Sequence, residues 1–275
     1  MMLCLWSVKG GSGCTVTTAA IGLLAAEEGD TLLVDLTGDL PLALGATASE
    51  VATSGAAGLG WGVAGWLSAP HPPRDALKRL ECPITPRLSL LPLGQPGSAP
   101  DRDDGGLQAS PAPGQSGNET QGHRPGPAWP GPAGRLALLA RLLSRDARTV
   151  VVDLGLGMAP VYQAAGGLPP AWPGSALQSF LDAATSSLLV TRPCYLSLHR
   201  AARSRQPDGI VLVDEPGRVL RPADVANALN APVLAFVPWE AAVSRAVDAG
   251  LLAQRVPRAL QALWSVIPAA GEGGR

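Results

Sequence analysis

Short apolar runs and stretches of helical composition alternate along most of the chain. Several of the runs indicate buried strands, because a strand that is covered on both faces is apolar at nearly every position. They cover residues 2–8, 31–35, 88–91, 149–153, 187–191, 209–213 and 232–238. Helical stretches such as residues 17–26 and 136–143 lie between them. The alternation predicts a single α/β domain over residues 1–275, a three-layer fold whose mostly parallel sheet of about seven strands has helices on both faces.

A glycine-rich segment joins the first predicted strand to the first predicted helix. It reads Lys9-Gly10-Gly11-Ser12-Gly13-Cys14-Thr15. The glycines let the backbone turn and point several N–H groups at one anion, at the positive end of the helix that follows. Strand, glycine turn and helix form the context in which such a loop binds nucleotide phosphates. An ordinary loop of this kind has a lysine before the threonine; here that residue is Cys14, and Lys9 lies five residues earlier.

The loop resembles that of the ParA/MinD superfamily of deviant Walker A ATPases, which reads K-G-G-x-G-K-[ST]-[ST]. The matching residues are Lys9, Gly10, Gly11, Gly13 and Thr15, whereas Cys14 departs from the pattern. The resemblance implies a P-loop NTPase-like fold that binds ATP and Mg²⁺. It also implies that Lys9 crosses a dimer interface to the partner subunit's nucleotide and that Thr15 holds Mg²⁺. The implied nucleotide-binding residues of the loop are Gly10, Gly11, Ser12, Gly13, Cys14, Thr15 and Val16.

The resemblance extends to the carboxylates that follow two later strands. In the family the second strand closes on D-x-D, with one aspartate tied to Mg²⁺ and hydrolysis. Here Asp35 is present, Thr37 replaces the second aspartate, and Asp39 is the nearest substitute. The implied catalytic residues are therefore Lys9, Asp35 and Asp39. Residues 149–153 resemble the Walker B strand, so the implied Mg²⁺ ligands are Thr15, Asp35 and Asp153.

The last third of the chain carries the part of the pattern that binds the base. Asp214 stands where relatives often have an asparagine that helps to recognise the base. Pro238 closes a strand that resembles the last one of the family, whose loop packs on the adenine. We therefore add Asp214 and Pro238 to the implied nucleotide-binding residues.

The departures at Cys14 and Thr37 fall on catalytic positions. Loss of the loop lysine removes a charge-assisted contact worth roughly 1.5–3 kcal/mol, about a ten- to hundredfold loss of affinity. Phosphoryl transfer depends on positioned positive charge, so hydrolysis is expected to suffer more than binding. Two hypotheses follow: a nucleotide-dependent homodimer with weak or absent hydrolysis, or a non-catalytic pseudo-ATPase scaffold that binds protein partners.

A small residue at the lysine position and the Gly-Asp-Leu that follows Thr37 are similar to the TadZ/CpaE branch. That branch implies a protein partner in Flp pilus or secretion machinery. The septum-site-determining proteins of actinobacteria are an equally open interpretation, and they imply a partner in division machinery.

Composition narrows the location and the partners. The formal net charge is −1, so there is no global basic field to hold nucleic acid, and we expect no nucleic-acid partner. The four cysteines, Cys4, Cys14, Cys82 and Cys194, show no zinc spacing and indicate reduced thiols in a cytoplasmic protein. Cys14 stands at a helix N-terminus, which tends to lower a thiol pKa, although a small residue filling the vacated lysine position is the favoured interpretation.

Three segments fall outside the repeating pattern. Residues 95–133 are dense in Pro, Gly and Ser and predict a disordered insertion. Residues 51–70 lack the density of large apolar side chains of a membrane span, and predict a loop and short helix; Trp61 and Trp66 there are either a partner surface or core. Apolar residues recur at helical spacing over residues 256–267 and favour a final helix packed on the sheet. Recruitment of that segment to the inner face of the membrane is the less favoured alternative.

Overall fold

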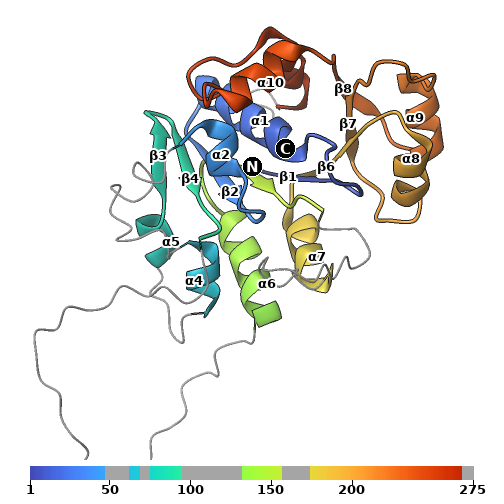
Figure 1. Ribbon diagram of the computed structural model, residues 1–275. Coiled ribbons are helices and arrows are strands. Elements are labelled where there is room, and N and C mark those ends of the chain that lie inside the picture. Colours follow the sequence, from blue (N-terminus) through green and yellow to red (C-terminus); the bar gives the residue numbers. More distant parts are fainter. Residues whose placement is uncertain (47–61, 69–74, 95–131, 157–173, 268–275) are drawn as a thin grey trace, which may run out of the picture.

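The computed structural model describes residues 1–46, 62–68, 75–94, 132–156 and 174–267 (Figure 1). These residues form one eight-stranded sheet in the order β3-β4-β2-β5-β1-β6-β7-β8, in which only β3 and β4 pair antiparallel. The strands are β1 (Met2–Trp6), β2 (Thr31–Asp35), β3 (Cys82–Thr85), β4 (Leu88–Leu91), β5 (Thr149–Asp153), β6 (Ser186–Thr191), β7 (Gly209–Val213) and β8 (Val233–Val237). The predicted mostly parallel α/β sheet is confirmed.

Helices cover both faces of this sheet, which confirms the predicted three layers. One face packs against α4 (Val63–Ser68), α5 (Ala76–Arg79), α6 (Pro132–Leu143), α7 (Gly174–Ala183), α8 (Tyr195–Ala201) and α9 (Pro222–Leu229). The other packs against α1 (Cys14–Glu28), α2 (Leu40–Leu44), α10 (Ala241–Asp248) and the 3₁₀-helix η1 (Arg258–Val266). Successive side chains of a strand point to opposite faces, so β1 sends Cys4 and Trp6 into the first core and Leu3 and Leu5 into the second.

The sheet has one strand more than the seven that the sequence predicts, and the additional strand is β3. Pro83 lies inside it and has no N–H group to donate to a neighbouring strand, which confines such strands to sheet edges. In agreement, β3 is the outermost strand, and its register with β4 shifts between Pro83 and Thr85. A short run interrupted by proline does not have the apolar pattern on which the other strands were predicted.

The last described segment packs inside the protein. Of the stretch 256–267 predicted to form a final helix, residues 258–266 form the 3₁₀-helix η1, where Leu260 and Leu263 are buried against β8 and α1. Their side chains therefore belong to the core. Within the ranges that the structure describes, no helix is both long and apolar enough to cross a membrane.

Two of the remaining expectations fall partly on residues outside the described ranges. Trp66 is 3% exposed and packs in the core with α6, so of the two alternatives for this residue the core one holds. Trp61 lies outside the described residues. The predicted insertion at 95–133 does too, except for its last two residues, with which α6 begins.

Candidate functional site

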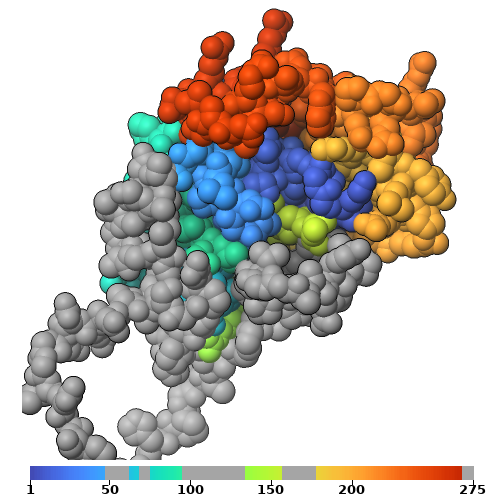
Figure 2. Space-filling model, in the orientation of Figure 1, coloured from blue at the N-terminus to red at the C-terminus, as the bar shows by residue number. Residues whose placement is uncertain are grey.

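The glycine loop and two aspartates meet at the carboxyl ends of three neighbouring strands. β5 lies between β1 and β2, and its last residue, Asp153, pairs in register with Leu5 and with Asp35. Parallel strands end on the same edge of the sheet, so the loop after β1 faces both carboxylates. The structure thus brings together the loop, Asp35 and Asp153, as the sequence implied. Figure 2 shows the dark-blue loop region open at the surface, between the lighter-blue segment after β2 and the orange C-terminal third.

The loop ends where α1 begins, and its backbone is shaped by two glycines. Gly11 and Gly13 have φ of 71° and 87°, left-handed values that favour glycine. The Ser12 hydroxyl donates to the Lys9 carbonyl oxygen at 2.6 Å and closes the turn. Gly13 is the N-cap of α1 and provides no side-chain cap, and the first four N–H groups of a helix have no acceptor within it. This end of α1 is therefore suited to an anion.

Asp35 and Asp153 form a buried carboxylate pair that Thr37 bridges. Both aspartates are 0% exposed. The Thr37 hydroxyl lies 3.0 Å from Asp35 Oδ1 and 3.2 Å from Asp153 Oδ2, and its single proton can serve only one of them at a time. Asp35 Oδ1 also accepts the N–H groups of Thr37 at 2.9 Å and Gly38 at 2.8 Å. Asp35 Oδ2 is buried and has no hydrogen-bond partner among the described residues.

The pair is electrostatically strained. Burial, and to a smaller extent the charge of Asp153, raise the pKa of Asp35 to about 6 against the lowering effect of the N–H groups of Thr37 and Gly38. Burial also raises the pKa of Asp153, which the hydroxyl of Thr15 and the N–H of Gly155 oppose. Buried like charges with an unpaired oxygen are the arrangement that a cation would relieve.

Cys14 turns toward the same pair. Its Sγ lies 3.4 Å from Asp153 Oδ1, and the thiol is buried. Burial and then the charge of Asp153 raise the pKa of this thiol well above its ordinary value. The lowering that a helix N-terminus suggested is therefore wrong, because desolvation and a neighbouring carboxylate outweigh the helix dipole. The favoured interpretation, a small neutral residue in the place of the lysine, agrees with this position.

The residues present fit Mg²⁺ that arrives with a phosphorylated ligand. Mg²⁺ usually binds through one or two carboxylates together with phosphate oxygens and water. Asp35, Asp153 and the Thr15 hydroxyl, which donates to Asp153, supply such a set, and Asp35 Oδ2 is without a partner. Across the described ranges no cluster of three or more His, Cys, Asp or Glu side chains could hold a metal unaided.

Asp39 and Lys9 lie at the rim of this site. Asp39 is exposed at the start of α2, where its N–H donates to the Thr37 hydroxyl at 3.4 Å. The structure does not bring its carboxylate to the buried pair, and Thr37 occupies the space between Asp35 and Asp153. Lys9 is partly exposed at the start of the loop.

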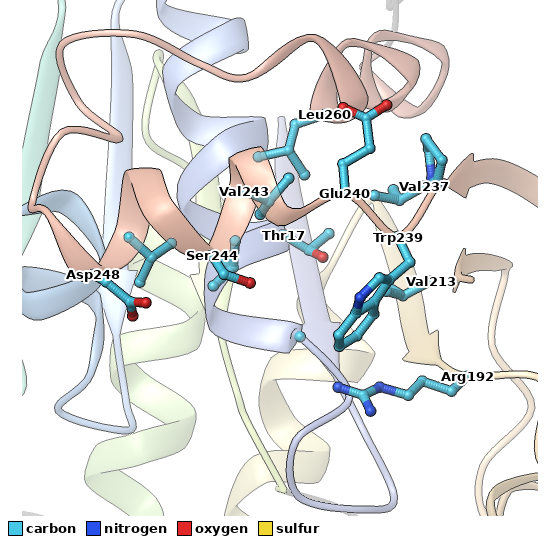
Figure 3. A pocket seen from close by; sticks show the side chains of 14 residues that line it. Thr17, Arg192, Val213, Val237, Trp239, Glu240, Val243, Ser244, Asp248 and Leu260 are labelled. Atoms are coloured by element: carbon cyan, nitrogen blue, oxygen red, sulfur yellow. The ribbon is translucent and has the colours of Figure 1, made fainter. Parts of the chain in front are cut away.

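A cavity of about 250 Å³ opens beside the N-terminus of α1 (Figure 3). Its walls are largely apolar, and three of the implied nucleotide-binding residues line it: Gly13, Val16 and Pro238. Asp214 does not line it; its backbone N–H donates to Val237 O at 2.8 Å and its carboxylate accepts the Glu215 N–H at 2.9 Å. Sequence reasoning missed Arg192 and Trp239, although each directly follows a predicted strand.

Gly155 supports the loop and the carboxylate pair at once, and its replacement by alanine should destabilise the protein. Its φ is +53°, its carbonyl accepts the Ser7 N–H at 2.7 Å, and an added Cβ would lie 2.5 Å from Thr37 Cγ2. We expect Gly155→Ala to lower the free energy of unfolding by about 1–2 kcal/mol through the left-handed backbone conformation alone. The clash with Thr37 adds to this cost, because hydrogen bonds hold the Thr37 side chain in place. Denaturant unfolding measures the change. Gly10→Ala, with nothing within 4 Å of its Cβ, is the control, and equal stability of the two variants would contradict the prediction.

Comparisons with known proteins identify the fold. No family model matches the chain, and no curated protein sequence matches it either. Solved structures do. MinD in the MinC:MinD cell division complex of Aquifex aeolicus is 17% identical, with 96% of this chain and 92% of that chain covered and a TM-score of 0.60. A ParA family ATPase from Chlorobium tepidum is 16% identical, with 98% and 92% covered and a TM-score of 0.54. McdA of Cyanothece in complex with ATP is 13% identical, with 96% and 94% covered and a TM-score of 0.56. The chain has the fold of the MinD and ParA ATPases.

Proposed function

We propose that this chain is a nucleotide-binding positioning or assembly factor of the MinD/ParA type, which forms a homodimer when it holds Mg²⁺-ATP and hydrolyses ATP slowly or not at all. The observation that carries the proposal is the meeting of the glycine loop, at the N-terminus of α1, with the buried pair Asp35 and Asp153. Asp35 Oδ2 in this pair has no hydrogen-bond partner among the described residues. The fold shared with MinD, ParA and ATP-bound McdA supports it.

Each residue would have a definite task. The N–H groups of the loop and of the first turn of α1 would bind the phosphates, and Thr15, Asp35 and Asp153 would hold Mg²⁺. When bound, Mg²⁺ supplies positive charge that neutralises the phosphate oxygens. Thr37 is neutral and cannot take a proton from water as a carboxylate would. Cys14 contributes no cation to the transferring group, so the chain retains binding groups and lacks two groups that promote hydrolysis.

The edge of the sheet that carries the loop also carries exposed apolar side chains. They follow the carboxyl ends of β2, β6, β7 and β8, and are Leu42, Tyr195, Leu196, Val219 and Trp239. Tyr195 is 76% exposed and Val219 is 89% exposed. Exposed apolar groups gathered on one edge favour a protein–protein contact. These side chains support a dimer whose contact would lie beside Lys9. They also support a contact with a protein partner, as MinD of Aquifex aeolicus forms a complex with MinC.

The finer assignment is a cytoplasmic factor that places pilus or secretion machinery, as the similarity to the TadZ/CpaE branch implies. A septum-placing role is the alternative within the same class. Co-purification of the chain with a secretion ATPase supports the first, and co-purification with division proteins supports the second.

A second candidate function is a non-catalytic scaffold that binds protein partners without nucleotide. Two observations favour it: the neutral, inward-turned Cys14 and the Thr37 bridge that already satisfies part of the carboxylate pair. The two functions differ in one measurable property, nucleotide affinity.

Titration of the protein with a fluorescent ATP analogue, with and without Mg²⁺, separates the two candidates. We expect micromolar binding that needs Mg²⁺ and weakens about tenfold in Lys9→Ala and in Thr15→Ala, since each variant removes one charge-assisted contact. Lys78→Ala, an exposed lysine on α5, is the matched control. Sedimentation analysis should show a dimer only with Mg²⁺-ATP. Absence of binding at millimolar nucleotide sinks the proposal in favour of the scaffold.

A further inference from the structure

Arg192 enters the cavity beside the glycine loop, although it comes from a different strand. It directly follows β6, whereas Trp239 follows β8, and the two side chains meet with the Arg192 guanidinium carbon 5.1 Å from the centre of the Trp239 ring. Both residues line the cavity together with Gly13, the N-cap of α1. Figure 3 shows the guanidinium below the Trp239 ring, on the side of the cavity where α1 begins.

Among the described residues, no acceptor is hydrogen-bonded to the side chain of Arg192. Its Nε is buried and has no acceptor among the described residues, and none of the described carboxylates lies within ion-pair distance of its guanidinium. A buried N–H without a partner costs free energy, so such a group in a cavity points to a missing acceptor. The cation–π contact with Trp239 holds the guanidinium at this place in the cavity.

The charges around Arg192 are mixed: Glu240 and Asp248 line the same cavity, and Glu215 lies within electrostatic range together with Lys9 and Arg218. The pKa of Glu215 is lowered chiefly by its hydrogen bond with Arg218, and the charges of Arg192 and Lys9 lower it further. Arg192 and Lys9 therefore both lie within electrostatic range of Glu215. Arg218 is already paired with Glu215 at 2.9 Å, which leaves Arg192 and Lys9 to attract an anion.

We propose that Arg192 contacts the phosphate chain of the bound nucleotide, as the cation that replaces the lysine absent from position 14. A guanidinium binds phosphate through two parallel hydrogen bonds, so it supplies what the loop backbone alone cannot. The inference rests on the proposed nucleotide binding and names the side chain that makes such binding feasible with Cys14 in the loop. It also accounts for a cation that lines the cavity beside the N-terminus of α1 and whose buried Nε has no acceptor among the described residues.

The test compares ligands that differ in phosphate number. Affinities for ATP, ADP and adenosine are measured for the native chain, Arg192→Ala, Arg192→Lys and the control Arg141→Ala, an exposed arginine on α6. We expect Arg192→Ala to weaken ATP binding about tenfold, ADP binding less, and adenosine binding hardly at all. Arg192→Lys should recover part of the loss. An equal loss for all three ligands means that Arg192 holds the base, and overturns the phosphate assignment.

A second arm uses the substitution that the loop lacks. In the Arg192→Ala background, Cys14→Lys should restore ATP affinity, and its effect there should exceed its effect in the native chain, because either cation can serve the phosphates. If Cys14→Lys changes the ATP affinity by the same factor in the native chain and in the Arg192→Ala background, the assignment is overturned. If the native chain binds ATP and Arg192→Ala binds it as tightly as Arg141→Ala does, only this inference is wrong. If the native chain binds no ATP, the proposed function is wrong as well. Thermal unfolding of each variant establishes that it is folded.

Discussion

Cys14→Lys is expected to raise the affinity for Mg²⁺-ATP by about ten- to hundredfold. The loop backbone, the α1 N-terminus and the Asp35–Asp153 pair are in place, so the substitution adds a cation to an otherwise formed site. A hydrogen bond between charged groups contributes more than a neutral one, and a lysine at the start of α1 can reach out of the loop where the thiol turns inward. Isothermal titration of the native and substituted proteins measures the change.

The control is Cys14→Ser, which removes the thiol without adding charge and should leave the affinity near that of the native chain. A second readout is hydrolysis, which should rise less than binding because Thr37 is still neutral. The structure also shows how Cys14→Lys could fail to raise the affinity for ATP. If the new ammonium turns toward Asp153, as the thiol does, it pairs with that carboxylate and the affinity for ATP does not rise.

Asp35→Asn is expected to stabilise the ligand-free protein at neutral pH by up to about 3 kcal/mol. Burial raises the pKa of Asp35 from the ordinary 3.8 to about 6. Between these values the folded protein binds more protons than the unfolded chain, so the free energy of unfolding falls as the pH rises. The penalty is small below pH 4 and complete above about pH 7. Asparagine removes the charge and keeps an oxygen for the N–H groups of Thr37 and Gly38.

Urea unfolding between pH 4 and pH 8, with a chelator present, measures this difference. The native protein should lose stability relative to the variant across the window, and the two should converge near pH 4. Asp39→Asn is the matched control, because that carboxylate is exposed at the start of α2. Mg²⁺-ATP should reverse the order by stabilising the native protein more. A variant no more stable than the native protein at pH 7 means that the buried pair is not strained.

The main architecture could be predicted because buried parallel strands are apolar at nearly every position. β1, β5 and β6 all have this pattern, and each was placed correctly from the sequence. β3 was not, because Pro83 interrupts it and because it is paired on one side only. Edge strands are determined by the neighbour that they join as much as by their own composition.

The candidate site was predictable where topology alone brings residues together. Asp35 and Asp153 end neighbouring strands, so their pairing follows from strand order. The pKa of Cys14 could not be predicted, since it depends on burial and on a carboxylate that is distant in sequence. In the sequence Thr37 is only the residue in place of the second aspartate, whereas the structure gives it a bridging role between two carboxylates.

The contact between Arg192 and Trp239 left no signal in the sequence. The two residues come from loops after β6 and β8, which are separated in the sheet by β7. Each is an unremarkable residue at a strand end, and only the fold places both in one cavity that residues of α1 and α10 also line. A contact between side chains of two loops depends on the three-dimensional fold and cannot be predicted from the sequence pattern.

The position of β1 between β5 and β6 has a consequence for biosynthesis. The Met2 N–H donates to the Thr185 hydroxyl, 183 residues further along the chain. A ribosome adds about 5–20 residues per second, so the first strand made waits about ten seconds or more for both of its neighbours. Both edges of this apolar strand are open until β5 is made, and one edge is open until β6 is made, so the strand is exposed to other nascent chains. We therefore expect that fragments ending before β6 aggregate, and that the yield of the intact chain responds to chaperone supply and to translation speed more than its final stability suggests.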